Sequence, residues 1–262
     1  MTSDQCDDLN FFVNDPLRKK ILEKEFYKDA FVRVKFKDKY AAAGEFENKT
    51  TNLVGTIYVP KSLVVIRTEN KNLDKFKNEE SFNKWYRKCT EDTIYKKLYK
   101  PVLDNFKKNS YTFKEKKEHI QGWDREMLCC AQGTLDHELA HIKNKHTEKR
   151  IRNNLKVAIG IGLIALPAFL RKNKINTAFS SYLAYDVLTK KGRRDREKEA
   201  DAGVRDDVDI LRAMANYFER QEKEKNPLTR ALDSILSPLS THPSDRYRKN
   251  YFNSRADALE QE

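Results

Sequence analysis

Hydrophobic positions change their spacing along the chain. Within residues 31–66, apolar and polar side chains alternate and β-branched residues are frequent, as in Phe31–Lys37. This period of two predicts two or three β-strands, separated near Gly44, Gly55 and Pro60. Further along, apolar residues recur every three or four positions, which predicts helices. The pattern therefore predicts a mainly helical fold with a small sheet near its beginning.

Residues 68–120 combine a high charge density with aromatic side chains at helical spacing, namely Phe76, Phe82, Trp85, Tyr86, Tyr95 and Tyr99. We expect two or three amphipathic helices here. Aromatic residues between lysines can stack on nucleic-acid bases. The buried face of a helix is the more common role of such a stripe, and we expect burial.

Apolar residues at helical period predict two further helices, over about 123–149 and 193–221. Between them lies an apolar run at 157–170, whose 14 residues fall short of the roughly 20 that span a bilayer. Basic residues flank this run, which suits a segment at a membrane interface. A buried core helix kinked at Pro167 is the alternative, and the sequence leaves both open.

Composition limits the class of protein less than the pattern does. Of the 262 residues, 39% are hydrophobic and 35% are charged, with a net charge of +12. A basic surface suits acidic partners such as nucleic acid or anionic lipid. Lysines and acids are interleaved in this chain, however, which is typical of solvated faces. Peripheral membrane contact through 157–170 is therefore a candidate, and nucleic-acid binding is not expected.

The cysteines and the N-terminal residues bear on the compartment. Cys6, Cys89, Cys129 and Cys130 show neither metal-site nor disulfide spacing, which favours free thiols in a reducing compartment. The acidic start lacks the layout of a signal peptide. We expect a cytoplasmic protein that could associate with membranes, without a full transmembrane helix.

The sequence His137-Glu-Leu-Ala-His141 carries the clearest chemistry. Residues four apart share one face of a helix, so His137 and His141 can bind one metal ion. Glu138 lies beside that face, where it can take a proton from a water at the metal. The pattern is that of a zinc peptidase.

A catalytic zinc usually has three protein ligands, so a third is expected downstream. Glu197 and Asp201 are four residues apart and share one helical face, whereas Glu199 points elsewhere. One of the two carboxylates could bind the metal and the other could orient a ligand histidine. Residue chemistry alone does not decide between them.

Three motifs in order carry a family resemblance. They are His137-Glu-Leu-Ala-His141, Glu197-Lys-Glu-Ala-Asp201 and His242-Pro-Ser followed by Arg248. Together they resemble the HtpX/CAAX-prenyl-protease family of zinc metallopeptidases. The layout is more similar to the compact BepA and Oma-type members than to the multi-spanning prenyl proteases.

The resemblance implies one Zn²⁺ per chain, with His137, His141 and Glu197 as its ligands. It implies Glu138 as the general base and Asp201 as a hydrogen-bond partner of a ligand histidine. His242 would lie near the open coordination position, where it would stabilise an oxyanion or cap the metal in a latent form, and Arg248 would help to position it. His146 matches a histidine often found one turn beyond the motif, where it could support a ligand.

For the fold class, we expect a mainly α protein of the α+β zincin type. This would be a catalytic helix bundle with a small mixed β-sheet and a helical insertion. Residues 1–30 would form a lead-in and 31–262 a peptidase domain. Within that domain, 68–120 is the expected insertion, placed as a lid beside the cleft.

For function, we expect a zinc-dependent endopeptidase that acts on protein or peptide substrates, in protein quality control. The alternative is a basic module that binds nucleic acid or a membrane surface and retains a metallopeptidase fold. A pure binding module has no need for Glu138, which favours the enzyme.

Overall fold

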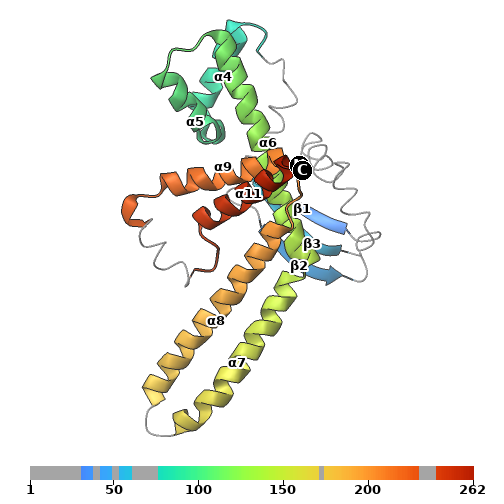
Figure 1. Cartoon of the computed structure of the whole chain (residues 1–262), viewed down its shortest axis with the longest axis vertical. Helices are drawn as coiled ribbons and strands as arrows, with labels where there is room; N and C mark the ends of the chain where they lie inside the picture. Colours follow the sequence, from blue (N-terminus) through green and yellow to red (C-terminus); the bar gives the residue numbers. More distant parts are fainter. Residues whose placement is uncertain (1–30, 38–41, 49–52, 61–75, 171–173, 230–239) are drawn as a thin grey trace.

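The chain is arranged around one long helix, α6 (Phe113–Lys143), which runs through the middle of the molecule (Figure 1). The computed structural model describes residues 31–37, 42–48, 53–60, 76–170, 174–229 and 240–262. The expected lead-in over residues 1–30, and the part of the expected strand region beyond residue 60, lie outside these ranges.

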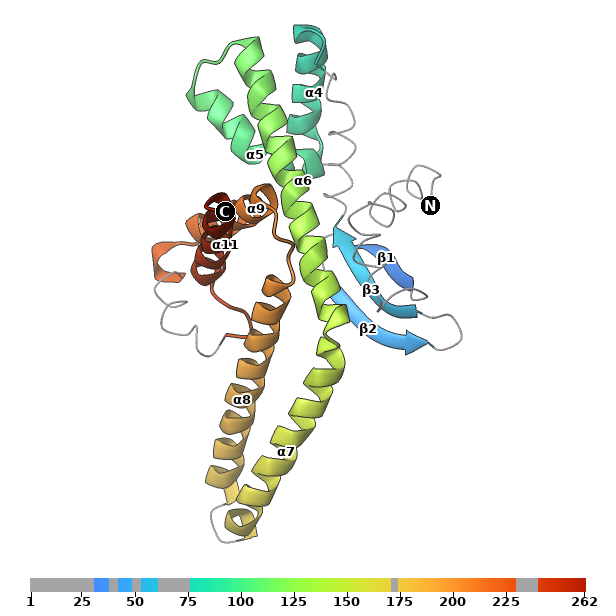
Figure 2. The ribbon, with the colours of Figure 1, turned by 45° about the vertical axis from the view of Figure 1, so that its right-hand side comes forward.

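Seven helices make up most of the described chain. They are α4 (Glu79–Glu91), α5 (Thr93–Lys108), α6, α7 (His146–Leu170), α8 (Lys174–Ala202), α9 (Val208–Glu224) and α11 (Asp245–Glu260). Helices α4 and α5 lie at the N-terminal end of α6, and α7 and α8 form a hairpin that extends from its other end (Figures 1 and 2). Helices α9 and α11 pack together beside the middle of α6.

Three short strands precede the helices: β1 (Phe31–Lys37), β2 (Ala42–Asn48) and β3 (Leu53–Pro60). Their order is β1-β3-β2, with β3 parallel to β1 and antiparallel to β2. Strands β2 and β3 lie beside α6 (Figure 2).

The expected fold class, an α+β zincin whose catalytic domain includes a mixed sheet, is wrong. Among residues 76–262, leaving out the gaps named above, 86% are helical and none lies in a strand. The physical reason is that both hydrophobic cores of this part are built between helices and the turns that join them. The part that carries the H-E-x-x-H motif is therefore helical.

The first core encloses the aromatic stripe of the expected insertion. Phe76, Phe82, Trp85, Tyr95 and Tyr99 are all buried, where α4 and α5 meet the start of α6. Some of these rings pack edge to face, for example Trp85 against Tyr99 with 5.0 Å between ring centroids, and Tyr95 stacks on Tyr99. The predicted burial of these aromatic residues is confirmed. The role of 68–120 as an insertion or lid stays a prediction.

Helix α6 begins about ten residues earlier than expected because Thr112 caps it. The Thr112 hydroxyl accepts a hydrogen bond from the Glu115 amide, and the Glu115 carboxylate accepts one from the Thr112 amide. The helix ends at Lys143, and Lys145 has a left-handed backbone with φ of 50°. This turn lets α7 begin at His146 in a new direction.

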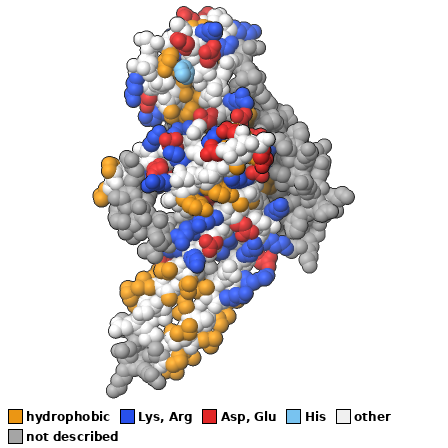
Figure 3. All heavy atoms as spheres, viewed as in Figure 1, with side chains coloured by type: hydrophobic (Ala, Val, Ile, Leu, Met, Phe, Trp, Pro, Cys, Tyr) orange, Lys and Arg blue, Asp and Glu red, His pale blue; other side chains and the backbone are white. Residues whose placement is uncertain are grey.

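The apolar run at 157–170 is exposed, so the buried core helix considered as an alternative is wrong. The side chains of Leu163 and Ile164 are 69% and 82% exposed on α7, and Phe179 is 63% exposed on the facing helix α8. All but three of the exposed large hydrophobic residues among the described ranges lie on this hairpin. Figure 3 shows them gathered over its far end. Nowhere in the described chain is a helix long and apolar enough to cross a membrane.

The helix expected over 193–221 is two helices. Helix α8 ends at Ala202 and α9 begins at Val208, where the Asp207 side chain accepts a hydrogen bond from the Ile210 amide. In the turn between them, a Cβ atom added to Gly203 would lie 2.4 Å from Ala140 Cβ of α6. The absence of a side chain at Gly203 thus lets the end of α8 approach the catalytic helix closely.

Gly203→Ala should lower the free energy of unfolding by about 1–3 kcal/mol, because the added methyl group overlaps Ala140 and must push the two helices apart. Urea denaturation followed by circular dichroism measures this change. Gly122→Ala is the matched control on α6, since a Cβ at Gly122 meets nothing within 4 Å. It should raise the free energy of unfolding by about 0.5–1 kcal/mol. Equal stability of Gly203→Ala and the natural chain would contradict the close packing.

Candidate metal centre

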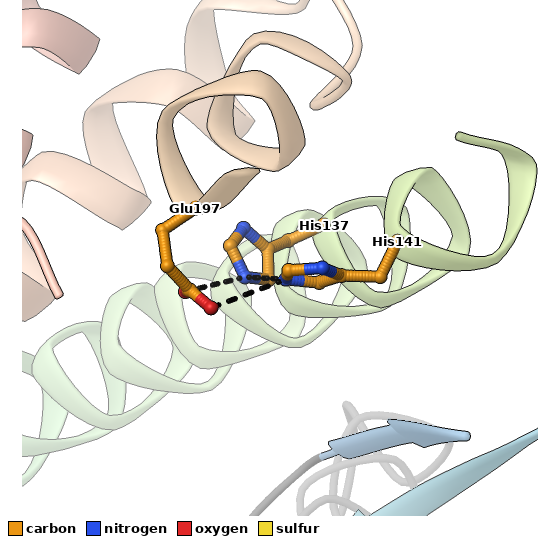
Figure 4. Close-up of side chains that lie close together, drawn as sticks. All are labelled: His137, His141 and Glu197. Atoms are coloured by element: carbon orange, nitrogen blue, oxygen red, sulfur yellow. Dashed lines mark hydrogen bonds and ion pairs between the residues drawn. The ribbon is translucent and has the colours of Figure 1, made fainter. Parts of the chain in front are cut away.

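Three side chains from two helices converge on one point. His137 and His141 lie on α6 and Glu197 on α8, and their nearest ring nitrogens and carboxylate oxygens all lie within 4.8 Å of one another. His137 Nε2 is 3.1 Å from His141 Nε2. Glu197 Oε2 is 3.5 Å from the first of these nitrogens and Oε1 is 3.6 Å from the second. Figure 4 shows the carboxylate facing both rings.

These distances fit a tetrahedral metal ion. Ligand atoms about 2.0–2.1 Å from a zinc ion lie about 3.3–3.4 Å apart at tetrahedral angles. The two histidine nitrogens are 3.1 Å apart, and each lies 3.5 or 3.6 Å from a different oxygen of Glu197, close to that value. Two imidazoles and one carboxylate are also a donor set that zinc commonly takes in catalytic sites. The residues present therefore fit a zinc ion.

His137 is held from behind by a buried ion pair. Asp201 is 0% exposed, and its Oδ1 lies 2.9 Å from His137 Nδ1. Arg248 of α11 binds the same carboxylate through both Nε, at 2.8 Å, and Nη2. The Arg248 guanidinium in turn stacks over the Phe218 ring, 4.1 Å from its centroid. Asp201 thus fixes the proton of His137 on Nδ1 and leaves Nε2 facing the centre.

His141 is held by a second relay that includes two residues of other helices. His146, the first residue of α7, places Nδ1 2.7 Å from His141 Nδ1. Its Nε2 faces Glu199 Oε2 at 3.1 Å. A carboxylate favours the proton on the nearer ring nitrogen, so His146 Nδ1 is free to accept the His141 Nδ1 proton. His141 Nε2 then also faces the centre with its lone pair.

The electrostatics of the cluster favour one positive charge at its middle. Burial disfavours the charged form of His137, but hydrogen bonds to Asp201 and Glu197 outweigh this and raise its pKa to about 9. Burial, followed by the neighbouring charge on His137, lowers the pKa of His141 to about 4. Burial also opposes ionisation of Glu197, yet hydrogen bonds from His137 and His242 hold its pKa well below the ordinary value. The second ring proton of His137 thus supplies the positive charge that a metal cation would otherwise bring to the cluster.

The centre opens onto a cleft of about 330 Å³ whose lining includes Glu138 and His242. Glu138, next to His137 on α6, is 9% exposed. His242 lies just before α11, with its side chain 63% exposed and Nδ1 3.2 Å from Glu197 Oε2. That contact raises the pKa of His242 above its ordinary value, although burial works against it.

A third ion pair anchors the turn between α8 and α9 to the catalytic helix. Asp136, directly before His137, is 2% exposed and accepts two hydrogen bonds from Arg205, at 2.6 Å from Nε and 2.8 Å from Nη2. Such a two-pronged pair fixes both distance and orientation. It holds the C-terminal end of α8, which carries Glu197 and Asp201, against α6.

The structure brings most of the sequence-derived site residues together. His137, His141 and Glu197 converge, Asp201 and His146 lie behind the two histidines, and Glu138 and His242 line the cleft. Arg248 differs from its expected place, because it contacts Asp201 and His137, and no hydrogen bond joins it to His242 among the described residues. The distinction matters because Arg248 acts on the buried side of His137, away from the cleft.

Sequence reasoning missed Glu199 and the pair of Asp136 with Arg205. Glu199 points away from the face of Glu197, as expected, but that direction leads to His146 on the neighbouring helix. A cross-helix contact of this kind leaves no periodic signal. Asp136 had one available signal, namely an acidic residue within the apolar face of the motif helix, where an ion-pair partner is to be expected.

Comparison with known proteins agrees with this geometry. Residues 131–255 match the model for peptidase family M48. The match covers just under half of the chain and shows that this part is similar to the M48 metallopeptidases. Members of family M48 are zinc metallopeptidases. No curated protein and no solved structure matches the chain.

Two glutamate variants test the ligand set. Purified protein should hold close to one zinc per chain, and Glu197→Ala should lose it because a ligand is removed. Glu199→Ala is the matched control two residues away, and it should keep the metal with an affinity roughly tenfold weaker, since it supports His141 only through His146. Elemental analysis after dialysis and chelator competition measure both effects. Loss of metal from Glu199→Ala but not from Glu197→Ala would overturn the choice of ligand.

Proposed function

We propose, on the premise of the M48 match over residues 131–255, that the chain is a zinc-dependent endopeptidase of protein quality control. The observation that carries the proposal is the convergence of His137, His141 and Glu197 beside Glu138 in one cleft. A peptidase family implies protein or peptide substrates. Unfolded proteins are the substrates that quality control would supply.

One Zn²⁺ would be held by His137, His141 and Glu197. When bound, zinc supplies Lewis-acid polarisation of water and of the scissile carbonyl. Asp201 and His146 keep the two ring nitrogens aimed at that ion, through the contacts described above. The open side of the donor set is the side that faces the cleft.

Glu138 would serve as the general base. It takes a proton from the water that attacks the peptide carbonyl, and later gives that proton to the leaving amine. Its low exposure suits this work, because bulk water does not surround the carboxylate and it stays within the cleft. Its position next to His137 keeps it within the cleft.

His242 would act on the developing oxyanion. Its raised pKa favours the protonated form, which can donate a hydrogen bond to a negatively charged oxygen. The same side chain, 3.2 Å from Glu197, could instead cap the metal in a latent form. Arg248 would be a positioning residue that holds Asp201 against His137.

A second candidate function, binding to an anionic membrane surface, rests on the exposed hairpin. The apolar run Val157–Leu170 is about 20 Å long at the helical rise, which is enough to enter one leaflet of a bilayer about 30 Å thick. Exposed basic residues on the same two helices, such as Arg152 and Lys156 on α7 and Lys191 on α8, would meet lipid phosphates. Membrane binding and proteolysis are compatible in one molecule.

Glu138→Gln should abolish hydrolysis of an unfolded substrate such as casein, by at least about a hundredfold, while the zinc content is unchanged. Release of acid-soluble fragments measures the rate, and elemental analysis measures the zinc. Glu126→Gln on the same helix is a control that lies outside the cleft. Full activity of Glu138→Gln would refute the mechanism. If the natural chain is latent, His242→Ala should raise its activity, and Glu138→Gln in that background completes the test.

Flotation with vesicles of phosphatidylcholine and phosphatidylserine tests the membrane surface. The natural chain should float, and the double variant Leu163→Glu/Ile164→Glu should bind at least about tenfold more weakly, because a carboxylate is costly in hydrocarbon. Leu228→Glu is the control, since Leu228 is 71% exposed but lies away from the hairpin. Failure of the natural chain to float would reject lipid as the partner. A dimer that the double variant disrupts would assign the surface to a second copy.

A further inference from the structure

Three arginines line the same cleft as the candidate metal ligands. Arg150 lies on α7, and Arg193 and Arg196 lie on α8, at the base of the hairpin. Arg193 and Arg196 are three residues apart, so they project from the same side of α8. The neighbouring helix α7 contributes the third guanidinium.

Arg196 is the informative member because it is buried. Arg196 is only 8% exposed, and its Nη2 atom is buried without a hydrogen-bond partner. A buried guanidinium without a partner is costly, since the lost hydration is not replaced. Within the described ranges, neither Arg196 nor Arg150 nor Arg193 forms an ion pair with a carboxylate.

Glu197, the acidic residue next to Arg196 in the sequence, is engaged with the histidines. The Glu197 oxygens face His137, His141 and His242 at 3.2–3.6 Å. Arg150 and Arg193 line the same cleft as Arg196. Three positive charges thus line one cleft, and a bound anion would offset their mutual repulsion.

We propose that Arg150, Arg193 and Arg196 form a subsite for a carboxylate of the bound peptide chain. The proposal rests on the proposed peptidase function, because it assigns the substrate class of the same cleft. Guanidinium groups bind carboxylates through paired, charge-assisted hydrogen bonds, which suits the unpartnered Nη2 of Arg196. The carboxylate belongs either to an acidic side chain near the scissile bond or to the C-terminus of the substrate.

Peptide binding separates these two sources. One series moves a single Glu through a neutral peptide with blocked ends, and a reference peptide has Gln at every such position. A further peptide is neutral but has a free C-terminal carboxylate. Calorimetric titration uses the full chain carrying Glu138→Gln, so that peptides are bound without being hydrolysed.

We expect at least one carboxylate-bearing peptide to bind about tenfold or more tightly than the blocked Gln peptide, as one charge-assisted pair would provide. Tighter binding of a Glu peptide assigns the subsite to an acidic side chain. Tighter binding of the free-ended peptide assigns it to the chain terminus. Equal binding of all the peptides would overturn the proposal.

Arginine variants connect the preference to these residues. Arg196→Gln should remove the preference, and exposed Arg193→Gln, which carries little risk to folding, should reduce it severalfold. Lys191→Gln is the matched control, because it removes one exposed positive charge from the same helix outside the cleft. A preference that survives both arginine variants would refute the assignment. The readout is binding, so absence of casein hydrolysis by both the natural chain and His242→Ala would refute the peptidase without deciding the carboxylate preference.

Discussion

The buried carboxylate of Asp201 is the constraint on which the candidate centre depends. A carboxylate that is fully removed from water is tolerable only if charged or polar partners replace the lost hydration. His137 and Arg248 are those partners, and they come from α6 and α11, whereas Asp201 itself belongs to α8. One carboxylate therefore joins three helices. Removal of either partner would leave a charge buried, so the three helices favour a single arrangement.

The ligand histidines are supported in unequal ways. His137 is supported by the buried ion pair of Asp201 with Arg248. His141 is supported by His146 and the half-exposed Glu199. His146 reaches its place because the chain turns at Lys145 in the left-handed conformation, directly after the motif helix. The geometry of His141 thus depends on a helix junction, and that of His137 on a packed core.

Much of the site, but less of the fold, could be predicted from the sequence. The i, i+4 spacing of His137 and His141 fixes their shared face, because helical geometry is local. The partner Glu197 needed a family pattern, since local spacing alone left it equivalent to Asp201. The turn at Gly203 was missed because apolar periodicity continues across it, and the close approach to Ala140 that requires glycine is a tertiary contact. Likewise, an apolar segment has the same sequence pattern whether it is buried or exposed, so the sequence could not predict which of the two applies to 157–170.

Helix α8 carries both exposed apolar residues of the hairpin and the third candidate ligand, so a movement of one end of this helix is transmitted to the other. A tilt of α8 about the contact of Gly203 with Ala140 would displace its two ends by unequal amounts. At the helical rise, Glu197 lies about 9 Å from this point and Phe179 about 36 Å. A tilt that moves Phe179 by some distance therefore moves Glu197 by about a quarter of it. A binding partner that tilted the far end of the hairpin would in this way also change how closely the carboxylate approaches the two histidines.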